Sequence, residues 1–307
     1  MIRSTLFKLG IKIGFALLAF WFLSKKLDYS QLPELFYTMN YPLLGVAIAL
    51  QYLSIAAAAL RWQSVMGSLG FDERFAFYQN LYFKGFFFSQ ALPGSVGGDA
   101  VRLLALKENG YALSDSLYGI FIDRVVGLVG LLIISLIALF FAPAYLGHDV
   151  LGTVLLISAG GIAGFGVLLF LHKIADFSRY SRLGFVDELS KRMFSVYGSA
   201  QNASYQITLS VLIHFLSILC VYSIASAAHL GVEFGAFLCL MPLVILLTLL
   251  PISFAGWGVR EGAMVALFSM SGASKEAIMS VSIAYGVILI VSSIPGLYGW
   301  VRSKNLA

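Results

Sequence analysis

The chain has 307 residues, of which 60% are hydrophobic and 11% are charged, and its mean hydropathy is +0.90. Soluble domains hold about half apolar and a quarter charged residues, so this balance excludes a soluble globular protein and predicts a polytopic integral membrane protein. The net charge of +5 is modest, and the basic residues cluster in loops, where they set membrane orientation rather than bind nucleic acid.

The first half of the chain begins with an apolar run at 8–24, which is followed by two lysines instead of a small-residue cleavage site. We therefore predict a retained first span rather than a removed signal peptide. A full crossing takes about 20 mostly apolar residues, and residues 41–61 and 114–141 meet that requirement. Residues 75–107 are also apolar, but the sequence LPGSVGGDAVR breaks them into two short limbs.

The second half of the chain repeats this order. Residues 151–173 and 206–229 are long enough to span, and between them residues 185–197 have the pattern of an amphipathic helix on the cytoplasmic surface. Residues 234–270 are again apolar but broken, here by LPISFAGWGVR. The last span is predicted at 276–301.

The two broken regions contain the same element, 158 positions apart. Without a gap, residues 92–102 and 250–260 share Leu, Pro, Ser, Gly, Val and Arg at aligned positions. Paired Pro/Gly-interrupted segments in the two halves of a membrane protein are the best sequence indicator of a transport site. We therefore predict one membrane domain over 1–307, built from two repeats of about 1–147 and 148–307.

Loop charge predicts how these repeats lie in the membrane. The polar stretch 173–203 carries five Lys or Arg residues, whereas the short loops around His148 and Glu233 carry none. The positive-inside rule therefore places this stretch and both termini in the cytoplasm, although Lys25 and Lys26 then lie outside.

With both termini cytoplasmic, the number of crossings permits either ten full spans or two re-entrant hairpins. Short limbs and Pro/Gly breaks favour hairpins, because non-helical backbone at membrane depth needs protein or a water-filled cavity around it. The expected fold is an all-α polytopic membrane protein with two inverted-topology repeats. Each repeat would have three spans and a Pro/Gly-broken re-entrant hairpin, the first hairpin entering from the cytoplasm and the second from outside.

Each copy of the repeated element also places one arginine inside an apolar region. Proline ends the preceding helix, and a helix restarting after Gly98 or Gly256 would present free N–H groups that attract anions. Arg102 and Arg260 follow about one turn later, and a guanidinium is well suited to phosphate. We therefore predict a phosphate site at each hairpin tip.

Neighbouring carboxylates allow a purely structural interpretation. Arg102 would then pair with Asp99 or Asp123, and Arg260 with the glutamate that follows it, and these pairs would only stabilise the fold. Asp123 and Arg124 are adjacent in a helix and point to different faces, so each needs a partner elsewhere. We predict Arg102 as the partner of Asp123, with solvation of Asp123 in a cavity as the alternative.

Three strings, LPGSVGGDAVRLLAL, FIDRVVGL and LPISFAGWGVREGAMVAL, together resemble the lysylphosphatidylglycerol synthase transmembrane-region family, also called flippase-like. The resemblance covers essentially the whole chain. In larger bifunctional members, this region is regarded as the lipid-flipping part and a separate soluble domain makes the aminoacyl-lipid. The chain ends six residues after Val301, so synthase activity is not expected. Free-standing relatives are linked with glycosyl carrier lipids or hopanoids.

The predicted function is therefore a lipid translocase of the cell inner membrane, without ATP hydrolysis of its own. Its partner would be a membrane lipid of phospholipid, polyprenyl-phosphate or hopanoid type, with Arg102 and Arg260 as the phosphate-binding residues. Supporting positions, from the repeat and from the resemblance, are Pro93, Ser95, Gly97, Gly98, Asp99, Asp123, Arg124, Pro251, Ser253, Gly256, Gly258 and Glu261.

Two other functions stay open. One is a membrane-embedded lipid or polyprenyl-phosphate transferase with Asp123 or Glu261 as base. The other is an accessory subunit of a glycosyltransferase or lipid pathway that docks through 173–203. The sequence shows no metal-ligand cluster, Walker loop or nucleophile motif, so we expect no metal, no cofactor and no enzyme activity.

Overall fold

The computed structural model describes residues 36–91, 96–141, 145–174, 184–249 and 255–304. These residues form helices, and no strand occurs among them. Five of the described helices are long and apolar enough to cross a membrane: α3 (Tyr41–Ser68), α6 (Leu113–Ala138), α7 (His148–Ile174), α9 (Ala200–Ala227) and α12 (Lys275–Lys304). Five of the six predicted spans are thereby confirmed as helices of spanning length. The first, at 8–24, lies outside the described residues.

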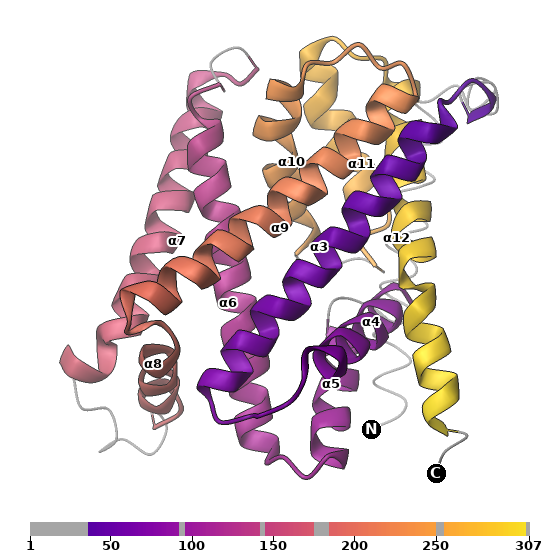
Figure 1. Ribbon diagram of the computed structural model, residues 1–307. Helices are drawn as coiled ribbons and strands as arrows, with labels where there is room; N and C mark the ends of the chain where they lie inside the picture. Colours follow the sequence, from indigo (N-terminus) through magenta and orange to yellow (C-terminus); the bar gives the residue numbers. More distant parts are fainter. Residues whose placement is uncertain (1–35, 92–95, 142–144, 175–183, 250–254, 305–307) are drawn as a thin grey trace, which may run out of the picture.

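Helices α3 and α9 lie side by side across the middle of the molecule (Figure 1). Both begin at a polar cap, since Asn40 and Ser199 accept hydrogen bonds from backbone N–H groups of the first helical turn. The N–H of Asn40 also donates to the carbonyl of Ala227, at 2.8 Å, which joins the start of α3 to the end of α9. The two helices therefore run antiparallel.

Four shorter helices fall in the two broken regions. They are α4 (Phe75–Ala91), α5 (Val96–Glu108), α10 (Phe234–Thr248) and α11 (Val259–Phe268). At 1.5 Å per residue they are about 26, 20, 22 and 15 Å long, all below the ~30 Å of a hydrocarbon core. Helices α4 and α5 lie toward one end of the molecule, whereas α10 and α11 lie toward the other (Figure 1).

The start of α5 differs from the sequence expectation. The helix does not restart after Gly98 but begins at Val96, so both Gly97 and Gly98 belong to its first turn. The physical reason is a close helix crossing, because a Cβ on Gly98 would collide with the carbonyl of Gly85 on α4 and with the side chain of Ser89. Gly98 thus allows α4 and α5 to touch rather than ending a helix.

In the second copy, α11 does begin after Gly256, at Val259. Gly256 and Gly258 have φ angles of 81° and 82°, a left-handed backbone that glycine adopts without steric cost. The other predicted residues of the two elements, namely Pro93, Ser95, Pro251 and Ser253, lie outside the described residues.

Gly98→Ala is expected to lower the free energy of unfolding by about 1–3 kcal/mol, since the added methyl group meets backbone that cannot rotate away. The thermal unfolding midpoint in detergent would measure the loss. Gly67→Ala is the matched control, because a Cβ at Gly67 meets nothing within 4 Å. Equal midpoints for the two variants would contradict the close crossing of α4 and α5.

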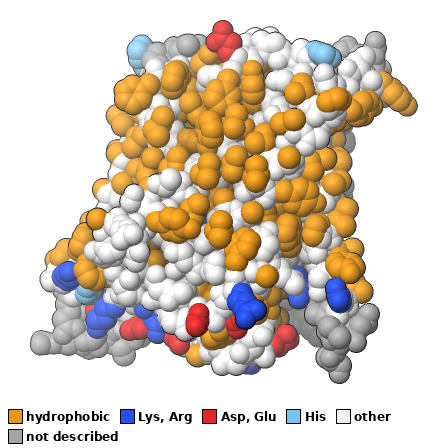
Figure 2. Space-filling model, in the orientation of Figure 1, with side chains coloured by type: hydrophobic (Ala, Val, Ile, Leu, Met, Phe, Trp, Pro, Cys, Tyr) orange, Lys and Arg blue, Asp and Glu red, His pale blue; other side chains and the backbone are white. Residues whose placement is uncertain are grey.

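The predicted amphipathic segment is confirmed as α8 (Gly184–Tyr197), which packs against α7 and α9. On the face drawn in Figure 2, Lys and Arg side chains gather along the edge where α8 lies, and hydrophobic side chains cover the band above it. Helix α7 contributes to the exposed apolar surface with Leu155, Leu156 and Ile157. This pattern is that of a multi-pass membrane protein, in which apolar side chains face lipid and cations lie at one boundary.

Candidate functional site

A buried ionic cluster lies where α3, α5 and α6 meet. Asp123 of α6 is 1% exposed and accepts a 2.9 Å hydrogen bond from Nε of Arg61 on α3. Nη1 of Arg102 on α5 lies 3.7 Å from the second oxygen of the same carboxylate. Arg61 also donates to the hydroxyl of Ser210 on α9, at 3.1 Å. One carboxylate therefore faces two buried guanidinium groups, and together with the bond from Arg61 to Ser210 these contacts join four helices.

Aromatic rings fix the position of Arg102. Its guanidinium carbon lies 4.7 Å from the ring centre of Trp62 and 5.0 Å from that of Tyr82. Cation–π contacts of this kind are worth about 2 kcal/mol or more when the groups are removed from water. Arg102 is only 4% exposed, and its Nη1 makes no hydrogen bond to any of the described residues. This atom faces the Asp123 carboxylate at 3.7 Å, so charge holds it there without a hydrogen bond.

Asp99 joins this buried cluster to the surface. Its carboxylate accepts hydrogen bonds from Nε and Nη2 of Arg124, at 3.0 and 2.9 Å, which is the bidentate geometry favoured by arginine and carboxylate. Asp99 also accepts from Nη2 of Arg102. The side chain of Arg124 is 41% exposed, and that of Asp99 is 23% exposed. The pair thus leads from solvent-accessible surface to the buried Arg102.

A cavity of about 210 Å³ opens beside these groups, between α4, α5 and α6. It is lined by Tyr82, Gly85, Phe86, Ser89, Gln90, Gly98, Asp99, Arg102 and Arg124. Together with the adjoining Arg61 and Asp123, the site holds three arginines and two aspartates, which leaves a net charge of +1 (3 − 2). Such a site attracts an anion, and hydroxyl and amide groups line its wall.

The predicted pairing of Asp123 with Arg102 is present, but it is the longer of two contacts. Arg61 is the closer partner, at 2.9 Å, although the predicted span ends at this residue and so places it at the membrane boundary. Helix α3 continues to Ser68, so Arg61 lies about 10 Å from the helix end. In the sequence, the apolar residues Val65 and Met66 beyond Arg61 were the sign that the helix continues. Both are fully buried in the structure. As expected, Asp123 and Arg124 point to different partners.

The second predicted arginine has its own counter-ion. Arg260 donates from Nη2 and Nε to Oε1 of Glu261, at 2.6 and 3.1 Å. The other oxygen of Glu261 accepts from the backbone N–H of Gly258, at 2.5 Å, and Ser282 of α12 donates to Oε1 at 3.3 Å. Glu261 is 0% exposed. The first turn of α11 and Arg260 therefore already bind the carboxylate of Glu261. The net charge of Arg260 and Glu261 together is zero (1 − 1).

The surroundings of the two predicted arginines are nevertheless alike. Arg260 lies 4.7 Å from the ring centre of Trp257 and 5.6 Å from that of Tyr285, so each arginine is covered by one tryptophan and one tyrosine. A Cβ on Gly286 would collide with Trp257, so this glycine makes room for the indole. The two sites share aromatic cover and differ in charge.

No group of three or more His, Cys, Asp or Glu side chains among the described residues is placed to hold a metal ion. A family model described as "Lysylphosphatidylglycerol synthase TM region" matches residues 9–296, which is nearly the whole chain. No curated protein matches the sequence of this chain.

Proposed function

This chain belongs to the lysylphosphatidylglycerol synthase transmembrane-region family, and from that membership we propose that it moves an anionic or carrier lipid head group between the two leaflets of the inner membrane. Membership supports lipid handling in general. The observation that carries the more specific proposal is the cavity of net charge +1 at Arg102 and Arg124. A lipid phosphate is the anion that a membrane supplies to such a site.

The proposed topology is a pair of inverted repeats, α3–α4–α5–α6 and α9–α10–α11–α12, each with a re-entrant hairpin. The order of two short helices between two long ones occurs in both segments, and α3 and α9 run antiparallel. Each short helix falls below the length of a full crossing. The basic end, where α8 lies, is placed in the cytoplasm together with both termini.

In the proposed binding step, a phosphate takes the place of the Asp99 carboxylate. Asp99 already occupies the fork of Arg124 and one donor of Arg102, and phosphate oxygens bind the same forks bidentately. The exposed Arg124 would meet the head group first, and the buried Arg102 would hold it deeper. The acyl or prenyl tails would remain in the bilayer, so only the head group needs a polar route.

At the opposite end, the proposed route reaches Arg260. This arginine is 4% exposed and bound to Glu261, so a head group would reach it only after α10 and α11 shift against α12. We assign it the outward-facing role on the strength of the repeat and of its matching aromatic cover.

The test is lipid exchange in liposomes that contain the purified protein and a trace of a fluorescent anionic phospholipid. A membrane-impermeant quencher that destroys outer-leaflet fluorescence should bleach about half of the label in protein-free liposomes and nearly all of it with protein. Mass spectrometry of the recovered lipid should find it chemically unchanged, whereas a covalent product would indicate a transferase. Equal bleaching with and without protein, over several head groups, would remove the proposal.

A further inference from the structure

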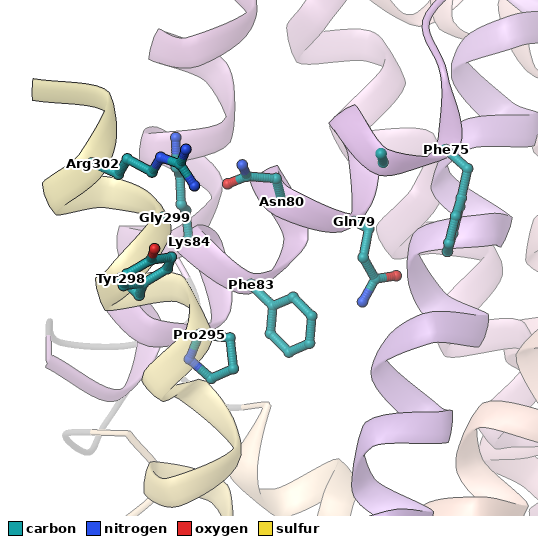
Figure 3. Close-up of a pocket in the computed structure, with 10 residues that line it drawn as sticks. Phe75, Gln79, Asn80, Phe83, Lys84, Pro295, Tyr298, Gly299 and Arg302 are labelled. Carbon is teal, nitrogen blue, oxygen red and sulfur yellow. The ribbon is translucent and has the colours of Figure 1, made fainter. Parts of the chain in front are cut away.

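A second cavity, of about 520 Å³, lies between α4 and α12. Helix α4 contributes to it with residues other than those that line the first cavity, among them Gln79, Asn80 and Lys84 (Figure 3). Helix α12 contributes Tyr298 and Arg302 from its last turns. Because α12 ends and α4 begins at the basic end of the molecule (Figure 1), the cavity lies at that membrane boundary.

The lining has the chemistry of a phospholipid head-group site. Lys84 and Arg302 are two cations from different helices, and the lining contains no carboxylate. Glu108 on α5 interacts electrostatically with Lys84 but lies outside the lining. Phe75, Phe83 and Pro295 give the cavity an apolar wall. Two cations next to an apolar wall suit a molecule that joins a phosphate to hydrocarbon.

Two glycines of α12 shape this region, one by allowing a close helix contact and the other by leaving the cavity open. A Cβ on Gly296 would collide with the backbone carbonyl of Phe83, so the two helices touch at that level. One turn further on, a Cβ on Gly299 would lie 2.9 Å from Oδ1 of Asn80 and 3.5 Å from Cε of Lys84. The glycine at 299 therefore leaves room where the amide and ammonium groups converge, as Figure 3 shows.

An unused acceptor points to a ligand with a hydroxyl group. Oε1 of Gln79 is buried and has no hydrogen-bond partner among the described residues. A buried acceptor without a partner is unfavourable, and a bound hydroxyl would supply the missing hydrogen bond.

We propose that this cavity binds the head group of an anionic phospholipid from the leaflet at the basic end. The phosphate lies between Lys84 and Arg302, a head-group hydroxyl donates to Gln79, and an acyl chain follows the apolar wall. Binding here is separate from the proposed route through Arg102 and requires no movement of lipid between leaflets.

The test is native mass spectrometry of delipidated protein titrated with phosphatidylglycerol, in wild type and in an Arg124→Gln background that weakens the first cavity. Lys84→Gln/Arg302→Gln is expected to weaken one lipid adduct at least tenfold in both backgrounds. Lys107→Gln/Lys173→Gln removes the same charge from exposed positions outside the cavity and should leave that adduct unchanged. Equal adducts in the two double variants would overturn the proposal.

Two further measurements identify the ligand and distinguish weaker binding from misfolding. Gly299→Ala keeps both cations but narrows the cavity, and it should weaken the same adduct several-fold at an unchanged unfolding midpoint. Glycerol phosphate, which lacks acyl chains, should not displace the lipid at equal concentration. Full displacement would assign the cavity to a free phosphate instead. Mass spectrometry measures lipid binding and the liposome assay measures lipid exchange. A negative result in one measurement therefore leaves the proposal tested by the other unaffected.

Discussion

Asp123→Ala is expected to lower the free energy of unfolding by about 3–5 kcal/mol, because it leaves the buried Arg61 guanidinium without its counter-charge and removes one of the two carboxylates beside Arg102. Arg61 is 5% exposed and Arg102 is 4% exposed, so water would solvate neither charge fully in the variant. Thermal unfolding of the purified protein in detergent would measure the loss as a lower midpoint.

Asp115→Ala is the control for this prediction. Asp115 also pairs with an arginine, Arg192, at 2.7 Å, but both side chains are partly exposed. Exposed pairs contribute about 0–1 kcal/mol. The midpoint should therefore fall far less than for Asp123→Ala, and similar shifts in the two variants would mean that the buried cluster does not stabilise the fold.

Arg124→Gln is expected to slow lipid exchange at least tenfold while leaving the fold intact. The substitution removes the exposed fork at the cavity and lowers the net charge of the site from +1 to 0. A hydrogen bond to a charged group contributes about 1.5–3 kcal/mol, and 1.4 kcal/mol corresponds to a factor of ten. The initial rate of label loss in the liposome assay is the measurement.

Two companion variants make this result interpretable. Asp99→Asn removes the resident carboxylate and raises the net charge to +2, so it should tighten binding of the anionic lipid, the opposite of Arg124→Gln. Lys107→Gln removes one charge from the exposed end of α5 and should leave exchange unchanged. If Arg124→Gln exchanged lipid as fast as Lys107→Gln, the cavity would have no role in transport.

The helices of this protein were predictable from sequence because long apolar runs are rare outside membranes. Their boundaries were less predictable, since a hydropathy pattern stops at the first strongly polar residue. Helix α3 continues past Arg61 because that arginine is neutralised inside the bundle, and α9 begins at Ala200, before the buried Gln206. Hydropathy assigns such residues to the water, whereas in the folded chain Arg61 is paired with Asp123 and Gln206 is enclosed by packing.

The site was predictable only in part. The repeated element correctly drew attention to Arg102 and Arg260 as buried cations, and adjacent-residue geometry showed that Asp123 and Arg124 need separate partners. The choice of partner was not predictable, because Arg61 and Asp123 lie 62 positions apart and neither belongs to the repeat. The pairing of Arg260 with the glutamate that follows it was one of the two alternatives drawn from the sequence, and the structure contains that pair.

The contact between Glu261 and Arg260 has a consequence for direction. A carboxylate attached next to its arginine acts as a competitor at high effective concentration, and it is never diluted away. Glu261 would compete with any head group for Arg260. Asp99, at the other end, binds two arginines, Arg102 and Arg124. If a head group follows the proposed route, it would meet a site of net charge +1 at Arg102 and a pair of net charge zero at Arg260, so the two ends would hold the same anion with different affinity.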